Sequence, residues 1–238
     1  MATERLTTIG FDADDTLWQN EQFYQLTQAR FAELLAEHAE PRNLSDRLLE
    51  AEKRNIKHYG FGIKGFTLSM IETAIEVTKG RAPASVISEI LAAGREMLAH
   101  PVETLPHVRE TLETLAASYR LVLITKGDLF DQERKVAQSG LGEFFTAVEI
   151  VSDKARLTYE RIFARFGDGP ETGMMVGNSM KSDVLPAIEA GSWGVFVPHE
   201  LTWSVEHAEA PDQSPRFRRI ADLGELPPLI EEIQGEGA

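Results

Sequence analysis

Short apolar runs separated by helical segments organise most of the chain. The runs cover residues 6–11, 121–125, 147–151, 174–176 and 194–197. Helical patterns of about 10 to 15 residues alternate with the last four runs, which is typical of βαβ crossovers. The pattern therefore predicts an α/β fold in which a parallel sheet is covered by helices on both faces.

The long connection between the first two apolar runs departs from this alternation. About a hundred residues separate them, far more than one crossover helix needs. Apolar positions repeat with helical spacing near residues 23–35, 44–56, 68–77 and 86–98, and Pro101 and Pro106 mark the end of the connection. We therefore predict a helical cap domain of roughly four helices. It would span residues 19–103 and interrupt a core domain formed by residues 1–18 and 104–238.

The remaining segments complete the core. Residues 105–117 are expected to form the crossover helix into the second strand. Residues 206–219 are polar and contain Pro211 and Pro215, so they are predicted to be a surface loop before a short closing helix near Leu229.

Composition and charge limit the kinds of molecule that the protein is expected to bind. The 238 residues are 42% hydrophobic and 26% charged, as in ordinary globular proteins, and carry a formal charge of −14. This charge argues against nucleic acid and against anionic membranes, which both bind clustered basic residues. The chain has no cysteine, no apolar signal core at its start and no run of ~18 apolar residues, so a cytoplasmic location is expected.

Two carboxylates mark the end of the first apolar run. Asp12 follows the run directly, and Asp14 lies two positions later. Open parallel sheets bind ligands at the carboxyl ends of their strands. Because two crowded carboxylates repel each other, the pair suggests a metal ion with an anionic substrate. The alternative is an Asp-rich turn with a helix cap.

Polar residues also follow the next three strands. Thr125 ends the second strand and precedes Lys126 and Gly127, where a hydroxyl and free backbone N–H groups can bind phosphate. Lys154 follows the third strand near the start of a helix, an unfavourable place for a cation that an ion pair with Asp12 would explain. The alternatives are an ordinary strand position for Thr125 and a solvated surface position for Lys154.

The fourth strand is followed by oxygen-bearing side chains. Gly177 and Asn178 come directly after it, and Asp183 lies five positions beyond Asn178. The oxygen atoms of Asn178 and Asp183 suit Mg²⁺, which prefers oxygen ligands in octahedral geometry. The alternative is a turn and a helix cap.

Together, these fragments resemble the haloacid dehalogenase superfamily in its phosphatase branch, which has a Rossmann-like core. The resemblance covers about residues 6 to 198 and includes a helical cap inserted between the first and second motifs. It rests on Asp12-Ala-Asp14-Asp15-Thr16, Thr125, Lys154, and Gly177-Asn178 with Asp183. One departure concerns the fourth motif, in which Asn178 replaces the family's first acidic residue and implies weaker metal binding.

The resemblance implies an Mg²⁺-dependent phosphatase that hydrolyses a small phosphorylated metabolite as a monomer or homodimer. Asp12 would be the nucleophile and Asp14 the general acid and base, with Thr125 and Lys154 stabilising the phosphate oxygens. The implied metal ligands are Asp12, the Asp14 carbonyl, Asn178 and Asp183. The expected substrate-binding residues are Thr125, Lys126, Gly127, Lys154 and Lys64.

Lys64 belongs to a basic stretch of the predicted cap. Residues 53–65 contain Lys53, Arg54, Lys57 and Lys64 beside His58 and three glycines, within an otherwise acidic chain. The stretch is either the part of the cap that meets the substrate or a solvated helix face followed by a loop.

Three other functions remain open. A 2-haloacid dehalogenase shares the fold and the nucleophile, but relatives of that kind lack the second aspartate, here Asp14. A phosphotransferase of the β-phosphoglucomutase type is poorly separated from a phosphatase by sequence. A catalytically silent binding protein is disfavoured because reactive residues fill all four motifs.

Overall fold

A computed structural model describes residues 5–235, and its contacts divide the chain into two units. The core unit comprises residues up to Gln19 together with residues 102–126 and residues from Glu133 onward. The insertion unit comprises residues 20–101 and 127–132. The chain therefore leaves the core twice, once after Gln19 and once after Lys126.

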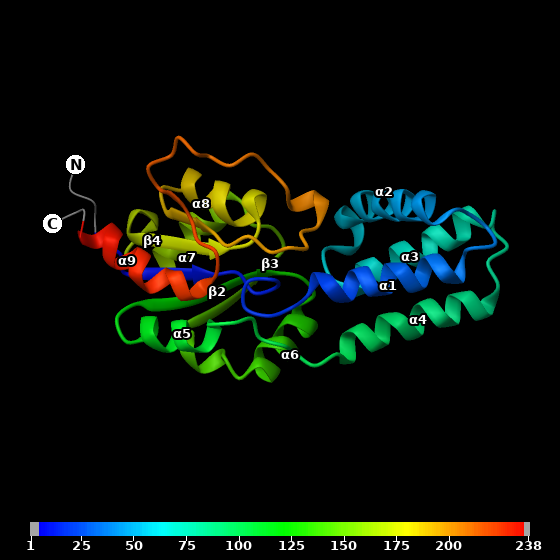
Figure 1. Cartoon of the computed structure of the whole chain (residues 1–238), viewed down its shortest axis with the longest axis horizontal. Coiled ribbons are helices and arrows are strands. Elements are labelled where there is room, and N and C mark those ends of the chain that lie inside the picture. The colour runs from blue at the N-terminus through cyan, green and yellow to red at the C-terminus, as the bar shows by residue number, and fades with distance from the viewer. Residues whose placement is uncertain (1–4, 236–238) are drawn as a thin grey trace. The chain divides into compact units, whose positions relative to one another are not determined.

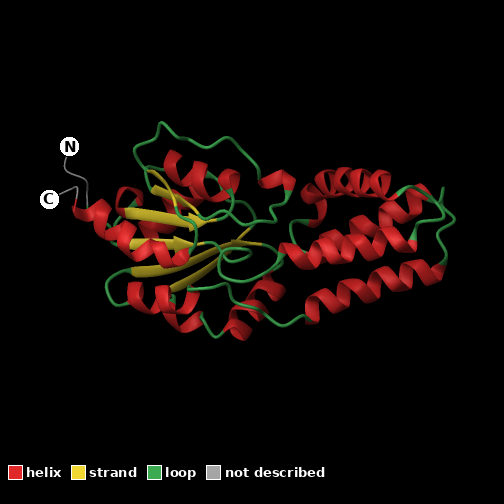
Figure 2. Ribbon diagram, viewed as in Figure 1, coloured by secondary structure: helices red, strands yellow, loops and turns green. Residues whose placement is uncertain are grey.

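The core unit is built on a six-stranded parallel sheet, drawn in yellow in Figure 2. Its strands are β1 (Thr8–Phe11), β2 (Arg120–Lys126), β3 (Ala147–Val151), β4 (Gly173–Gly177), β5 (Trp193–Phe196) and β6 (Phe217–Arg219). The strand order is β3-β2-β1-β4-β5-β6, so β1 pairs with β2 on one side and β4 on the other. The order reverses at β1, and the crevice beyond such a point is where doubly wound sheets bind ligands.

Helices cover both faces of this sheet, as Figure 1 shows. They are α5 (Val108–Ala116), α6 (Leu129–Ser139), α7 (Arg156–Phe166), α8 (Leu185–Glu189) and α9 (Leu226–Gly235). Alternate strand residues point to opposite faces. Ile9 and Leu121 pack in a cluster with residues of α5 and α9, whereas Val122 and Met175 pack in another with residues of α7 and α8. This double coverage explains why the strands are almost continuously apolar.

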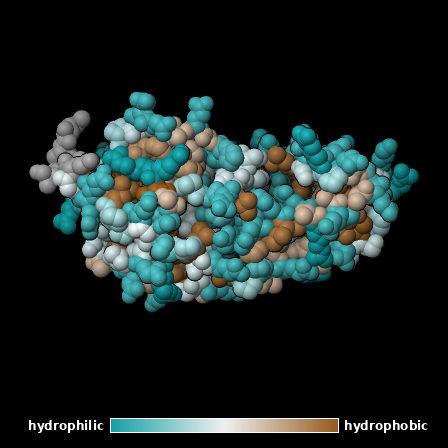
Figure 3. Space-filling model, viewed as in Figure 1, coloured by the Kyte–Doolittle hydropathy of each residue, from teal (hydrophilic) through white to brown (hydrophobic). Residues whose placement is uncertain are grey.

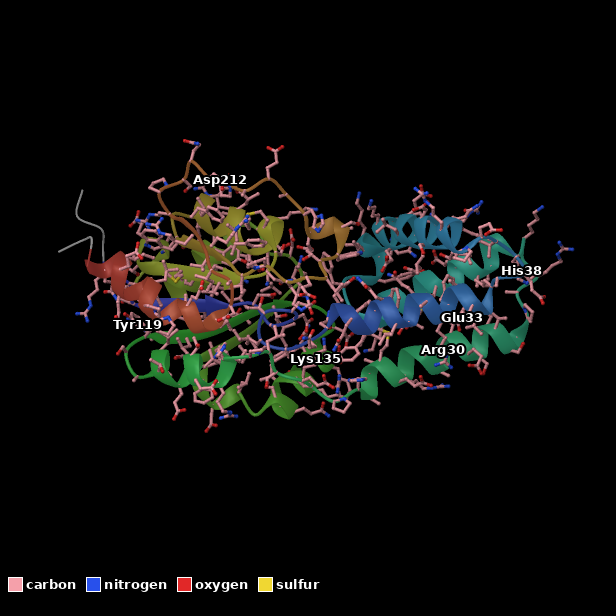
Figure 4. The ribbon with its side chains drawn as sticks, in the orientation of Figure 1. Arg30, Glu33, His38, Tyr119, Lys135 and Asp212 are labelled. Atoms are coloured by element: carbon pink, nitrogen blue, oxygen red, sulfur yellow. The ribbon has the colours of Figure 1, made fainter. Side chains whose placement is uncertain are left out.

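The helical insertion has a hydrophobic core of its own. It contains α1 (Glu21–Leu34), α2 (Pro41–Tyr59), α3 (Ile63–Val77) and α4 (Ala84–Ala99). Phe31, Leu48, Phe66 and Met70 are among the residues buried between these helices. Arg30 of α1, labelled in Figure 4, pairs with Glu89 and Glu96 of α4. The insertion thus has the separate core that an independent folding unit needs.

The α/β class, the parallel sheet and the helical insertion are confirmed, but one part of the sequence prediction is wrong. Residues 217–219, expected within a surface loop, form β6 and pair with β5. This three-residue edge strand contains two arginines and has no apolar alternation. The Arg218 guanidinium lies 4.9 Å from the centre of the Trp193 ring. This cation–π contact, and not burial of apolar side chains, packs the strand against its neighbour, so the sequence shows no apolar pattern there.

The face shown in Figure 3 is mostly hydrophilic, with separate small apolar patches. This distribution agrees with a net charge of −14. Within residues 5–235, no helix combines the length and apolar character needed to cross a membrane.

Candidate active site

The candidate site lies where β1, β2 and β4 end in the core unit. The backbone N–H of Asp12 donates to the carbonyl of Val176 at 2.9 Å, which extends the pairing of β1 and β4 by one residue. Asp12 is buried, with 7% of its surface exposed. The sheet therefore fixes this carboxylate at the point where the strand order reverses.

Lys154 joins two of the predicted site carboxylates. Its ammonium group donates to Oδ1 of Asp12 and, at 2.7 Å, to Oδ1 of Asp183. Burial and the Asp183 carboxylate raise the pKa of Asp12 to about 7, while Lys154 opposes this shift. Burial by itself would lower the pKa of Lys154, but the Asp12 and Asp183 carboxylates raise it well above its usual value. Lys154 therefore holds a positive charge beside the tip of β1.

Asp183 is fully buried and is held from two sides. Besides the bond from Lys154, its Oδ2 accepts a hydrogen bond from the backbone N–H of Ser179 at 2.9 Å. A Cβ atom on Gly177 would lie 2.3 Å from this Oδ2, so only glycine allows the approach. Gly177 thus has a packing role in the fourth motif.

Asn178 brings its side-chain amide to two other oxygen atoms. One terminal atom of the amide lies 3.2 Å from Oδ2 of Asp12 and 3.2 Å from the backbone carbonyl of Asp14. If this atom is nitrogen, it donates to both oxygens; if it is oxygen, three oxygens face one another, as around a cation. The backbone N–H of Asn178 donates to the hydroxyl of Thr16 at 3.1 Å, which holds the segment after β4 against the segment after β1.

With its oxygen turned toward Asp12 and Asp14, the Asn178 amide would complete a set of three oxygens that fits Mg²⁺. At metal–oxygen distances of about 2.0 to 2.1 Å, neighbouring ligands of an octahedron lie roughly 3 Å apart, close to the two distances of 3.2 Å from the amide. No group of three or more His, Cys, Asp or Glu side chains suited to a metal occurs among the described residues. The oxygen group would therefore hold a metal through a carbonyl and an amide as well as a carboxylate.

Asp14 is held by two donors that the sequence analysis did not select. Its Oδ1 accepts a hydrogen bond of 2.7 Å from the indole N–H of Trp18 and one of 2.9 Å from the ammonium group of Lys135. Lys135, labelled in Figure 4, comes from α6. Lysine is almost never buried without a partner, so one that is only 7% exposed signals an ion pair.

Lys126 joins a buried network around Glu206. Its ammonium group lies 2.8 Å from the Glu206 carboxylate and 2.7 Å from the hydroxyl of Ser182. Ser179 and Ser182 also donate to Glu206. Although burial opposes the shift, Lys126 and these hydroxyls lower the pKa of Glu206 to about 2. Glu206, the first residue of the predicted surface loop, is thereby held against the fourth motif.

The other predicted site residues lie in both units. Thr125 is buried at the end of β2, and its hydroxyl lies 3.3 Å from the Lys126 carbonyl. Gly127 adopts a φ of 143°, and Lys64 pairs with Asp128 at 3.0 Å within the insertion unit. Asp12, Asp14, Lys154, Asn178 and Asp183 are brought together in the core, whereas Lys64 and Gly127 belong to the insertion unit. The roles of all the predicted site residues remain predictions.

A model of the haloacid dehalogenase-like hydrolases matches residues 6–191. The chain belongs to this family. A haloacid dehalogenase-like hydrolase from Xanthomonas campestris is 41% identical, with a TM-score of 0.87 over 98% of this chain and 93% of that one. The resemblance seen in the sequence is therefore confirmed.

More distant members of the family carry names that describe function. A glyceraldehyde 3-phosphate phosphatase from Methanothermobacter thermautotrophicus is 26% identical over 83% of this hydrolase and 88% of its own length. A related structure from Bacillus subtilis, described as bound to magnesium, has a TM-score of 0.66 at 15% identity. It covers 95% of this hydrolase and 99% of its own chain, and at that identity the likeness concerns the fold.

Proposed function

We propose that this protein is an Mg²⁺-dependent phosphatase that hydrolyses a small phosphomonoester through an aspartyl-phosphate intermediate. The observation that carries the proposal is the approach of the Asn178 side-chain amide to Asp12 Oδ2 and the Asp14 carbonyl, which gives an oxygen group when the amide oxygen faces them. A divalent cation beside a nucleophilic carboxylate serves an anionic substrate such as a phosphate ester. The magnesium-bound relative supports the same choice of metal.

In this proposal Asn178, and not Asp183, completes the metal site. The Asn178 amide faces Asp12 and the Asp14 carbonyl, whereas the Asp183 oxygens are bonded to Lys154 and to the Ser179 N–H. Bound there, Mg²⁺ would offset the repulsion between the nucleophile and the phosphate. Asp183 would act through Lys154 by fixing the position of its charge.

The residues around Asp12 then have distinct roles in the reaction. Since Oδ2 of Asp12 belongs to the oxygen group, Oδ1 is the atom that attacks phosphorus. Asp14 gives a proton to the departing alkoxide, and the P–O bond to it breaks. In the second half-reaction Asp14 takes a proton from water, which attacks the phosphorylated Asp12 and releases phosphate. Lys154 and the Thr125 hydroxyl stabilise charge on the phosphoryl oxygens.

The named relative suggests a substrate class. Because the archaeal relative is called a glyceraldehyde 3-phosphate phosphatase, phosphorylated three-carbon compounds are the first candidates. Lys126 already neutralises Glu206, so its predicted contact with substrate would require a change of partner. Thr125 and Lys154 carry the phosphate contacts in this proposal.

A substrate screen with one variant tests the function. Phosphomonoesters, including glyceraldehyde 3-phosphate and 4-nitrophenyl phosphate, would be assayed for phosphate release with Mg²⁺ and with a chelator. Asp12→Asn should reduce Mg²⁺-dependent turnover by at least about 10³-fold, because it removes the nucleophile. Asp168→Asn, which changes an exposed aspartate of the core unit paired with Arg120, should leave turnover unchanged.

The same assay separates the rival reactions. Undiminished turnover by Asp12→Asn would contradict the mechanism. Halide release from 2-chloropropionate in the presence of chelator would indicate a dehalogenase instead. An isomerised phosphate ester without free phosphate would indicate a phosphotransferase.

A further inference from the structure

Two donors converge on a single oxygen of Asp14. The Trp18 indole N–H and the Lys135 ammonium group both bond to Oδ1, at 2.7 and 2.9 Å. Trp18 is 1% exposed, and the side chain of Lys135 is 9% exposed. A buried ammonium ion is costly without a partner, so this contact is a built feature of the core unit.

Both donors come from well-anchored parts of the chain. The Trp18 carbonyl accepts from the Asp15 N–H at 2.7 Å, and Trp18 forms a backbone bridge with Thr104. Lys135 projects from α6, whose helical backbone fixes the start of its side chain. The donors therefore set the direction of the Asp14 carboxyl group from two independent elements.

Two hydrogen bonds to one oxygen restrict the rotation of the Asp14 carboxyl group. Loss of either donor should therefore allow this group to turn away from the leaving oxygen.

We propose that Trp18 and Lys135 are positioning residues for Asp14, which hold its carboxyl group in the direction from which it delivers a proton to the leaving oxygen. The inference rests on the proposed phosphatase function. In the first half-reaction, Asp12 forms a bond to phosphorus, the bond to the leaving oxygen breaks, and the Asp14 proton passes to that oxygen. In the second, water gives one proton to Asp14 and its oxygen to phosphorus, and the bond between phosphorus and Asp12 breaks, which regenerates Asp12.

Dependence on the leaving group tests this role. We would measure kcat/KM at one pH and saturating Mg²⁺ for 4-nitrophenyl phosphate and phenyl phosphate. Nitrophenolate leaves with little need for a proton, whereas phenolate needs more. General acid catalysis contributes about 10²- to 10⁴-fold, so misdirecting Asp14 should selectively slow the phenyl ester.

Three variants, one control and one reference variant complete the experiment. Lys135→Met and Trp18→Phe should each lower kcat/KM for phenyl phosphate about tenfold more than for 4-nitrophenyl phosphate, and Lys135→Arg should restore much of the difference. Arg134→Met removes a positive charge from the neighbouring, partly exposed position of α6 and should leave the ratio of the two kcat/KM values unchanged. Asp14→Asn gives the reference for complete loss of proton transfer.

The outcomes separate this inference from the function on which it rests. Equal losses on both esters in Lys135→Met and Trp18→Phe, or no loss in either, would overturn the positioning role. If one variant fails to fold, the other still decides. Absence of turnover of every phosphomonoester by the unmodified protein would instead overturn the phosphatase proposal itself.

Discussion

At the scale of single residues, Asn178 is the most consequential departure from the family pattern. An aspartate at this position would add a negative charge beside Asp12, where the amide adds none. Without a metal, the amide nitrogen can donate to Asp12 and to the Asp14 carbonyl, at 3.2 Å each. The neutral side chain thus stabilises the metal-free site but attracts a cation less strongly.

Asn178→Asp should therefore tighten Mg²⁺ binding. Unit charges about 4 Å apart interact by roughly 4 kcal/mol at an effective dielectric constant of 20. Much of this is offset by desolvation, so the expected gain is about tenfold in affinity, or about 1.4 kcal/mol. Isothermal titration calorimetry with Mg²⁺ would measure it, and unchanged or weaker binding would contradict the assignment of Asn178 as a ligand.

At the scale of elements, α2 carries an acidic residue on its buried face. Glu52 is 9% exposed, and burial raises its pKa to about 7. Asn55, one turn further along, donates to Ser69 and Glu72 of α3. The contact between α2 and α3 therefore includes polar groups. A buried carboxylate such as Glu52 lowers the stability of the insertion unit when it ionises without a compensating partner.

The stability of the insertion unit should consequently depend on pH through Glu52. Below about pH 4.5 the group is protonated in both states and costs nothing. As the pH rises from there to about 7, it ionises in the unfolded chain but not in the folded one, so stability falls and then stays low. Glu52→Gln should therefore stabilise the protein at pH 8, by up to about 3 kcal/mol, but not at pH 4.

Chemical denaturation at the two pH values would measure this difference. Glu50→Gln, at an exposed position of the same helix, is the matched control and should show no such pH-dependent gain. Equal effects of the two substitutions at pH 8 would rule out ionisation of Glu52 as the cause.

At the scale of the whole molecule, Mg²⁺ can stabilise this chain of net charge −14 in two ways, by screening its negative charges and by binding at the site. Any salt screens the mutual repulsion of the carboxylates, while a bound ion stabilises only the folded state. Binding at a concentration of 100 times Kd would add about 2.7 kcal/mol. For a chain of this size each kcal/mol corresponds to roughly 2 to 4 °C in Tm.

Thermal melts should separate the two effects. Mg²⁺ at that concentration should raise Tm by about 5 to 10 °C above the value in NaCl of the same ionic strength. Identical Tm values in the two salts would show that screening alone is responsible and that the oxygen group holds no Mg²⁺.

The sequence alone determined the α/β class, the helical insertion and the residues at four strand ends. Each of these predictions rests on a local signal. The spacing of apolar residues indicates which positions are buried, and parallel sheets bind their ligands at the carboxyl ends of the strands. Asp12, Asp14, Lys154, Asn178 and Asp183 were all found in this way. Their catalytic roles depend on the resemblance and remain to be tested.

Apart from the ion pair of Lys154 with Asp12, only the tertiary structure decided which groups meet. Lys135 is distant from Asp14 in sequence, and Glu206 lies far from Lys126, so no spacing pattern connects either pair. The edge strand β6 is only three residues long, too short to show an apolar periodicity in the sequence. Pairing of charges and completion of the sheet depend on how β1, β2 and β4 lie side by side, which is a property of long-range packing.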